Sequence, residues 1–600
     1  MIRVSDYITE HLENIGCEAV FLLSGGGMMH LLDSVSRKKK LKYYCNHHEQ
    51  CSGMAADSYA RISGNIGVCY ATSGPGGTNT LTAVVGAYQD SSSVLFITGQ
   101  SKLSQTIEGS GLSGLRQFGT FEVDVIPGMK PYTKYAAMVK SAQDIRYHLE
   151  KALYLAKEGR PGPVFLDIPL DIQGAQIDPR QLRKFDADAE GFIKKEIEKK
   201  SDIETAFAYL TKAKRPIILA GHGIRIAGAV DLMLVLAEKM KIPVLSTCFG
   251  KDVIEYEHPL FVGHPGMKGD RAGNFAIQTA DVILSVGCSM HVTTTGYEMD
   301  EFAPKAIKII IDPDEWVLKR EQIKATLKIQ MDCRKFLEAT LKIAESSDYH
   351  SPVNWQKKCV SWKKDFVVYQ EPHKVESNQI NFYNFSSTLD QLAVSSDIVV
   401  TDAGSAFYVV GQAFRVKKGQ RVINSGSLGA MGFALPAATG AAVAAPQSRV
   451  LCITGDGSLQ TNLHELAVFH RNKLNVKIFI INNDGYVCIR NTQNNFFKGH
   501  LAGTSADSGV FIPNLQKTAE NFEIPFFKVS AFSLLEETLK KVLATPGPVF
   551  CEIITPRFQE IIPSVSSIRL ENGAMKSKPL HDMFPFMDEE KLNEALEISD

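Results

Sequence analysis

Short apolar runs alternate with longer amphipathic stretches along most of the chain. Runs rich in Val, Ile and Leu that are bounded by Gly, Pro or Asp are typical of strands buried on both faces of a parallel sheet. The clearest of them are Val68–Thr72, Val94–Thr98, Ile217–Ala220, Val282–Val286, Ile307–Ile311, Ile398–Thr401, Arg449–Thr454 and Val476–Ile481. The pattern therefore predicts an α/β fold of doubly wound parallel sheets. Gly-rich turns follow several runs, at the strand ends where such sheets bind ligands.

The alternation falls into three blocks, as expected for 600 residues, because one hydrophobic core rarely serves so long a chain. A charged segment at 192–200 separates the first two blocks and is interpreted as a solvated link or the first turns of a helix. After Pro556 the alternation stops, and we expect this tail to wrap the surface or to be partly mobile. The predicted units are domains at 1–175, 190–345 and 375–560, and a tail at 561–600.

One short pattern recurs at the close of the first and third blocks. Leu149–Leu153 precedes Pro161–Phe165, and Leu535–Leu539 precedes Pro546–Phe550, so that a helix, a Pro-Gly-Pro turn and a buried strand follow one another twice. A single helix–strand unit can recur by chance. We nevertheless interpret the echo as two related α/β domains on either side of a different middle domain.

Composition and charge exclude several classes of partner. The chain is 44% hydrophobic and 22% charged, carries a net charge of −1 and has a pI near 6.9, so nothing predicts binding to nucleic acid or to an anionic membrane. The eleven cysteines are odd in number and contain no Cys-x-x-Cys pair, which argues against a disulfide framework or a zinc ribbon. With no signal peptide and no spanning apolar run, we expect a cytoplasmic protein.

The strongest candidate for chemistry lies in the third block. The run Arg449–Thr454 leads into a tight turn, a predicted helix over Thr461–Asn472 and then the strand Val476–Ile481. The turn is Gly455-Asp456-Gly457-Ser458, and the strand runs into Asn482-Asn483-Asp484-Gly485-Tyr486. Glycines let the backbone approach phosphate oxygens, and free N–H groups at a helix start attract the anion.

The same two turns supply oxygen ligands for a metal. Asp456 offers a carboxylate, Asn483 an amide oxygen and Gly485 a backbone carbonyl, which together suit Mg²⁺. An unrelated Gly-Asp-Gly turn and Asn pair are the alternative. The order of strand, turn, helix, strand and Asn-Asn is far more specific than the turn alone.

In these motifs the chain resembles the thiamine-diphosphate enzyme superfamily. The resemblance implies thiamine diphosphate and Mg²⁺ as cofactors, with Asp456, Asn483 and Gly485 at the metal. It also places Gly455, Gly457, Ser458, Asn483, Gly485 and Tyr486 at the cofactor.

The first block carries an independent match. Cys45–Gln50, which contains His48-Glu49-Gln50, followed by Met54–Arg61, looks like the corresponding segment of acetolactate-synthase-type enzymes. The resemblance implies that Glu49 hydrogen-bonds N1′ of the cofactor's aminopyrimidine and favours the imino tautomer, whose nitrogen removes the thiazolium C2 proton. A glutamate solvated at a helix start beside two histidines is the alternative, and the metal motif decides for Glu49 as the catalytic residue.

Further turns match the family's cofactor contacts. Gly26 lies in an early Gly-Gly loop, Gly76 in a Gly-Pro-Gly turn, and Met431 in the loop that supports the folded cofactor. The remaining candidates in these turns are Ala403, Gly404, Ser405 and Gly429. The resemblance implies pyrimidine-binding, central and diphosphate-binding domains in that order, and a homodimer or dimer of dimers in which domains of two subunits face each other.

Departures from acetolactate synthase bear on the substrate. The stretch Thr120-Phe121-Glu122 lacks the family's Gln, Gln117 is out of register, and no Trp follows the Asn pair. We therefore expect a carboligase that decarboxylates a 2-oxo acid, pyruvate first, and transfers the acyl unit to a carbonyl acceptor such as a keto-sugar or aldehyde. Acetolactate synthase proper, a simple 2-oxo acid decarboxylase, a 2-hydroxyacyl lyase and a non-catalytic cofactor-binding subunit are the alternatives.

The middle block leaves a flavin open. Glycine turns lie where acetolactate synthases hold FAD, although some relatives keep this domain without flavin or bind another nucleotide there. These turns contain Gly221–Gly223, Gly263–Gly269, Gly287–Ser289 and Asp312–Asp314.

Overall fold

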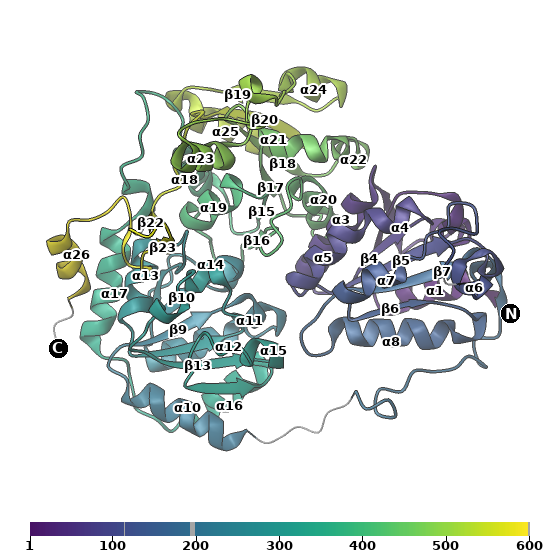
Figure 1. Ribbon diagram of the computed structural model, residues 1–600, viewed down its shortest axis with the longest axis horizontal. Helices are drawn as coiled ribbons and strands as arrows, with labels where there is room; N and C mark the ends of the chain where they lie inside the picture. Colours follow the sequence, from purple (N-terminus) through teal and green to yellow (C-terminus); the bar gives the residue numbers. More distant parts are fainter. Residues whose placement is uncertain (113, 193–198, 570, 598–600) are drawn as a thin grey trace.

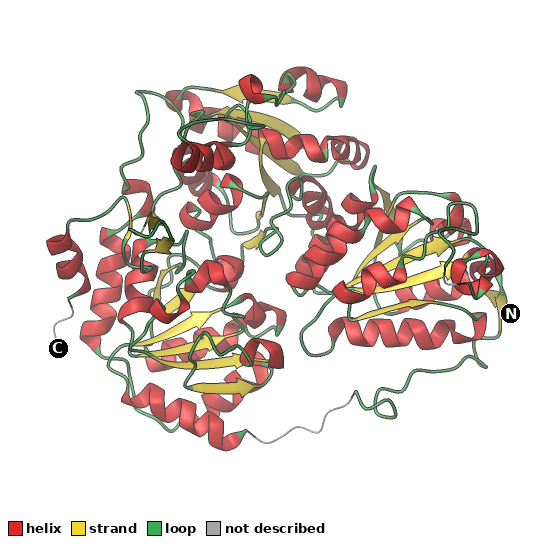
Figure 2. Ribbon diagram, in the orientation of Figure 1, coloured by secondary structure: helices red, strands yellow, loops and turns green. Residues whose placement is uncertain are grey.

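Three parallel sheets of six strands each, flanked by helices, build the protein (Figures 1 and 2). The computed structural model describes residues 1–112, 114–192, 199–569 and 571–597. All pairings within the three large sheets are parallel. The predicted fold class is confirmed, and all eight predicted strands are present.

The first sheet occupies the purple-to-blue lobe at the right of Figure 1. Its spatial order is β3 (Lys42–Cys45), β2 (Ala19–Leu22), β4 (Gly67–Ala71), β5 (Val94–Gln100), β7 (Val164–Pro169) and β6 (Tyr135–Met138). Its main helices are α1 (Val4–Asn14), α2 (Met29–Ser36), α3 (Glu49–Ser63), α5 (Leu81–Gln89) and α8 (Ile145–Lys157). Every residue of β2, β4, β5 and β7 is buried, as expected of strands covered on both faces.

The third sheet repeats the strand order of the first. It runs β16 (Arg421–Ile423), β15 (Ile398–Thr401), β17 (Val450–Gly455), β18 (Val476–Asn482), β20 (Val549–Ile554) and β19 (Phe526–Val529). Its main helices are α18 (Phe382–Leu392), α19 (Ser405–Ala413), α20 (Ala434–Ala444), α22 (Leu466–Asn472), α23 (Val487–Phe497), α24 (Leu515–Asn521) and α25 (Leu535–Ala544). In both sheets the strand after the Pro-Gly-Pro turn, β7 or β20, lies one place from the edge. The identical order agrees with the predicted kinship of the two blocks.

The middle sheet has a different topology. Its order is β11 (Phe261–Gly263), β10 (Val244–Ser246), β9 (Pro216–Ala220), β12 (Val282–Val286), β13 (Ile307–Asp312) and β14 (Leu327–Gln330). Numbered along the chain this is 3-2-1-4-5-6, the arrangement of nucleotide-binding sheets, in which the ligand crevice opens between the first and fourth strands. Here these are β9 and β12.

The first and third sheets are joined through the helix pair α3 and α20. One continuous apolar core contains side chains of both helices, among them Met54, Tyr59 and Leu435. Helix α20 is mostly Ala and Gly, and a Cβ built at Gly440 would overlap the carbonyl oxygen of Ala55 on α3. The two backbones therefore approach more closely than ordinary side chains allow.

A buried ion-pair network lies beside this junction. The Arg61 guanidinium contacts the carboxylates of Asp57 at 2.6 Å and Asp90 at 2.8 Å, and donates to the backbone carbonyl of Asn424 at 2.9 Å. The last bond runs from the first domain to the loop after β16. Arg61 and Asp57 are nearly inaccessible, so removing either would leave the other buried without its partner.

Of the charged segment 192–200, residues 193–198 lie outside the described residues, and α10 (Lys200–Lys212) follows. The tail forms two small antiparallel ribbons and the helix α26 (Glu589–Leu596), and it wraps the middle domain as expected (Figure 1). Leu580 and Met583 are buried, and Trp362 donates to the carbonyl of Ala595 at 2.8 Å.

No helix in the described part of the chain is both long enough and apolar enough to cross a bilayer.

The helix contact at Gly440 gives a direct test of the junction. We expect Gly440→Ala to lower the thermal midpoint of the protein by several degrees, because overpacking at a close backbone approach typically costs about 1–3 kcal/mol. The control is Gly411→Ala on α19, where a Cβ meets nothing within 4 Å and alanine favours the helix. Equal midpoints for the two variants would contradict the close contact.

Candidate functional site

The predicted metal turn lies at the carboxyl end of β17. Helix α21 (Asp456–Thr461) begins at Asp456 itself, is capped at its end by Asn462 and is followed by the 3-10 turn η8 (Leu463–Glu465) and then α22. The predicted helix over Thr461–Asn472 was therefore wrong at its start. The sequence Gly455-Asp456-Gly457-Ser458 suggested a turn, whereas in the structure Asp456, Gly457 and Ser458 begin a helix.

Asp456 is fully buried in this turn. Its Oδ1 accepts from the N–H of Gly457 at 3.0 Å and its Oδ2 from the N–H of Gly485 at 2.8 Å. Burial raises the pKa of this carboxyl to about 6, while the two N–H groups and the Arg490 guanidinium act in the opposite direction. The bond to Gly485 brings together the two turns that the sequence assigned to one metal.

The second turn is held by a buried arginine. Asn483 follows β18 and is buried, and the fully buried guanidinium of Arg490 donates to the carbonyl oxygens of Asn483, Asp484, Thr504 and Arg557. The same guanidinium lies 3.5 Å from Oδ1 of Asn483, a long separation for a hydrogen bond. The loop is thus shaped by the protein alone.

The Tyr486 ring packs directly against Gly457, at a position where only glycine leaves room for it. A Cβ built at Gly457 would overlap the Tyr486 ring, whereas one built at Gly455 meets nothing within 4 Å. The space over Gly455 is therefore open, next to the uncapped start of α21, where Ser458 also lies. An oxygen-only donor set beside open, N–H-rich backbone fits a metal-bound diphosphate.

A second buried carboxylate, Asp402, ties three loops together. Its Oδ1 accepts from the N–H groups of Ala403 at 2.8 Å and Gly432 at 2.9 Å, and its Oδ2 accepts from the Thr454 hydroxyl at 3.0 Å. It therefore connects the turn after β15, the Gly-rich loop before α20 and the end of β17. We did not single out this residue from the sequence, although an Asp directly between a buried strand and a Gly turn is a usable signal.

The other diphosphate-side candidates lie around this carboxylate. Ala403, Gly404 and Ser405 form the start of α19, which has no side-chain cap, so its first N–H groups are available to an anion. Gly429 and Met431 lie in the loop that Asp402 holds at Gly432. Met431 is 45% exposed, unusual for a large apolar side chain in a tightly held loop.

Glu49 lies in the first domain, at the start of α3. It is buried, and its Oε2 accepts from Nδ2 of Asn79 at 3.0 Å. His48 caps the helix, with Nδ1 accepting from the N–H of Gln50. The sequence prediction missed Asn79, which ends the Gly-Pro-Gly helix α4 (Pro75–Asn79) and orients the glutamate.

Gly26 and Gly76 lie near each other at the edge of the first sheet. The N–H of Gly27 donates to the Thr72 hydroxyl at 3.0 Å, and a Cβ built at Gly76 would press on the same threonine. A cavity of about 440 Å³ opens here, lined in part by Gly26, Thr72, Gln100, Thr120, Phe121 and Leu170.

The candidates thus form two groups. One gathers at Asp402 and Asp456 on the third sheet, and the other gathers at Glu49 and Gly26 on the first. Within the described residues no hydrogen bond or ion pair links Glu49 to the turn that carries Asp456. One folded chain therefore presents two half-sites that no described hydrogen bond or ion pair joins directly at Glu49 and Asp456.

The middle sheet has a cavity at its own topological switch point. Gly223 after β9 packs against Gly287 after β12, and Asp312 ends the next strand, β13. Arg160 of the first domain reaches the rim, where it pairs with Asp314 at 3.1 Å. Close glycine turns with an acidic residue at the neighbouring strand end suit a nucleotide.

Comparisons with known proteins agree with this geometry. Three family models match in order, each of the thiamine pyrophosphate enzymes: the N-terminal TPP binding domain at 2–117, the central domain at 203–340 and the C-terminal TPP binding domain at 402–553. A probable acetolactate synthase large subunit of Methanocaldococcus jannaschii is 31% identical, covering 92% of both chains. Acetolactate synthase 2, chloroplastic, of Zea mays is also 31% identical, covering 95% of this chain and 88% of its own.

The chain therefore belongs to the thiamine pyrophosphate enzyme family and is a thiamine-diphosphate-dependent, acetolactate-synthase-like enzyme.

Substitutions at the two glycines of the metal turn should affect different properties of the protein. We expect Gly455→Ala to leave the thermal midpoint of the cofactor-free protein unchanged and to weaken thiamine diphosphate binding at least tenfold, because the methyl group enters the open space over the turn. Gly457→Ala should lower the midpoint without cofactor, because it displaces the Tyr486 ring. Calorimetric titration and thermal melting measure both effects. If Gly455→Ala binds thiamine diphosphate with wild-type affinity, the assignment of the diphosphate to this position is wrong.

Proposed function

We propose that this enzyme decarboxylates a 2-oxo acid, pyruvate in the first place, and joins the remaining acyl unit to a carbonyl acceptor. The observation that carries the proposal is the pairing of a buried carboxyl at Glu49 with the oxygen-lined turn at Asp456 in one chain. The names of the relatives support carbon–carbon bond formation over simple decarboxylation and over a non-catalytic subunit.

When bound, thiamine diphosphate supplies the nucleophilic carbon and the electron sink for this reaction. We assign Asp456, Asn483 and the Gly485 carbonyl to Mg²⁺. The N–H groups at the starts of α19 and α21 receive the diphosphate.

We assign proton control to Glu49. Asn79 occupies only its Oε2, and no other described side chain bonds its Oε1, which is left to hold a proton toward the aminopyrimidine. Asn79 is a positioning residue, because it acts on the cofactor only through Glu49.

We propose that two copies of the chain complete each site, as a homodimer or a dimer of dimers. The separate half-sites support this arrangement, because the described contacts do not join Glu49 to Asp456 within one chain. The exposed Met431 supports it too, since a partner domain or the cofactor would cover that side chain.

The relatives favour a second pyruvate as the acceptor, with acetolactate as the product, over the keto-sugar or aldehyde that we expected first. The position of Phe121 favours the keto-sugar or aldehyde as a second candidate for the acceptor. Phe121 lines the cavity near Gly26, is 71% exposed and has a φ of +59°, an uncommon conformation for a bulky residue. Gln117, which is out of register with the family's Gln, donates to the carbonyl of Glu122 at 3.2 Å.

For the middle cavity we propose a nucleotide, with FAD and a flavin-free nucleotide as the two candidates. The absorbance spectrum of the purified protein separates them. For the compartment we propose the cytoplasm, because all eleven cysteines are unpaired.

Glu49→Gln tests the catalytic assignment. We expect turnover of pyruvate to fall at least about a hundredfold, in the range that general acid–base groups contribute, while thiamine diphosphate affinity stays within about threefold. The control is Glu204→Gln, a change at an exposed glutamate on α10. Turnover that survives in Glu49→Gln would remove this residue from the mechanism.

Product analysis by mass spectrometry tests the acceptor. Pyruvate, thiamine diphosphate and Mg²⁺ alone should give acetolactate. The second candidate stands if no acetolactate forms and carbon dioxide is released only after an aldehyde or keto-sugar is added, together with the product that joins the acyl unit to that acceptor. In that case Phe121→Ala should change the ratio of acetolactate to the product formed with the added acceptor by roughly tenfold, the scale on which pocket contacts discriminate between substrates.

A further inference from the structure

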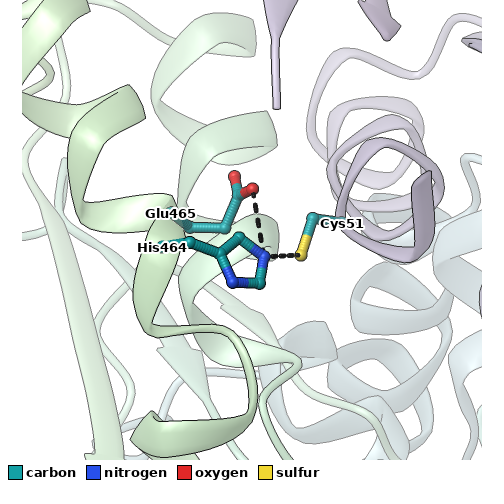
Figure 3. A group of neighbouring side chains, drawn as sticks. All are labelled: Cys51, His464 and Glu465. Atoms are coloured by element: carbon teal, nitrogen blue, oxygen red, sulfur yellow. Dashed lines mark hydrogen bonds and ion pairs between the residues drawn. The ribbon is translucent and has the colours of Figure 1, made fainter. Parts of the chain in front are cut away.

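Three side chains with metal-binding atoms meet where the first and third domains join (Figure 3). Cys51 lies in the first turn of α3, and His464 and Glu465 lie in the turn η8 that leads into α22. Sγ of Cys51 is 3.6 Å from Nε2 of His464, and that nitrogen is 3.8 Å from Oε1 of Glu465. All three ligand atoms lie within 4.8 Å of one another.

These separations are close to those of a tetrahedral zinc site. With a Zn–S bond of about 2.3 Å and Zn–N and Zn–O bonds of about 2.0–2.1 Å, tetrahedral angles place S and N roughly 3.5 Å apart and N and O roughly 3.4 Å apart. For these two pairs the atoms lie only a few tenths of an ångström farther apart than in the metal-bound geometry, and the third pair lies within 4.8 Å. Thiolate and imidazole together suit Zn²⁺, whereas Mg²⁺ prefers oxygen ligands throughout.

The surroundings hold the ligands in place. Glu465 is fully buried, and its two oxygens accept from Nδ2 of Asn46 at 2.7 Å and from the N–H of His47 at 3.0 Å. Such outer hydrogen bonds orient the ligands of metal sites. Oδ1 of the same Asn46 is buried and has no hydrogen-bond partner among the described residues.

Charge and access also fit a cation. Among the described ion pairs the only partner of the Glu465 carboxylate is His464, so no lysine or arginine of that set competes with an ion for it. Cys51 is fully buried, whereas the His464 side chain is 38% exposed, so an ion can enter from the histidine side.

We propose that Cys51, His464 and Glu465 bind one Zn²⁺, with the fourth position open to solvent. Binding displaces the thiol proton of Cys51 to solvent and involves no redox step. The ion would connect Cys51 on α3, two residues after Glu49, to the turn η8 that precedes α22. It is separate from the Mg²⁺ assigned to Asp456. The alternative is a hydrogen-bonded trio without affinity for a metal.

Cobalt titration of the full-length protein distinguishes the two. With thiamine diphosphate and excess Mg²⁺ present, one equivalent of Co²⁺ should produce a thiolate-to-cobalt charge-transfer band, which the oxygen ligands at Asp456 cannot give, and Zn²⁺ should abolish it. Cys51→Ser should lose the band. His464→Gln should weaken Zn²⁺ binding at least tenfold, and this half-exposed position keeps the test valid if Cys51→Ser fails to fold.

The matched controls are Cys45→Ser at the exposed end of β3 and His470→Gln on the exposed face of α22, both outside the cluster. Both should keep the band and the wild-type affinity for Zn²⁺. The proposal is overturned if the wild type shows no band at one equivalent of Co²⁺. A band that survives both cluster substitutions, or that Cys45→Ser removes, would equally overturn it.

Discussion

The close approach of α3 and α20 is the constraint on which the functional geometry depends. At Gly440 the backbone of α20 lies against the carbonyl of Ala55, and the surrounding Ala residues allow the contact along the length of both helices. Close packing of this kind tolerates little displacement, because interiors are as dense as organic crystals. Helix α3 carries Glu49 and Cys51 at one end and Arg61 at the other, so one helix pair sets the position of all three relative to the third sheet.

The third sheet shows how a chain buries carboxylates next to a proposed anion site. Asp402 and Asp456 are both inaccessible, and no described ion pair joins either to a lysine or arginine, yet each accepts hydrogen bonds from the backbone of two different loops. Those bonds offset the desolvation that burial imposes. The carboxylates thereby hold together the loops that follow the neighbouring strands β15, β17 and β18. The positively charged Arg490 side chain also holds loops together, by donating hydrogen bonds to their carbonyl oxygens.

The fold could be predicted from the sequence because its signal is local. Runs such as Val282–Val286 carry their own periodicity, and the metal motif is legible because Asp456 is contiguous with its glycines. Roles that arise from partners distant in sequence were missed. Asn79 meets Glu49 across 30 residues, and Cys51 meets His464 across 413. The start of α21 was misplaced because Gly and Asp favour turns and also helix starts, and only the neighbouring strand decides between them.

The shared strand order of the first and third sheets has a consequence for how such an enzyme can change. One architecture, used twice in a single chain, carries the residues proposed to hold the metal and diphosphate on one sheet and the buried Glu49 on the other. Because the two sites are built from separate loops, substitutions that remodel the pocket around Phe121 leave the hydrogen bonds at Asp402 and Asp456 untouched. A change in the pocket that receives the substrate can therefore leave the residues proposed to retain the cofactor in place.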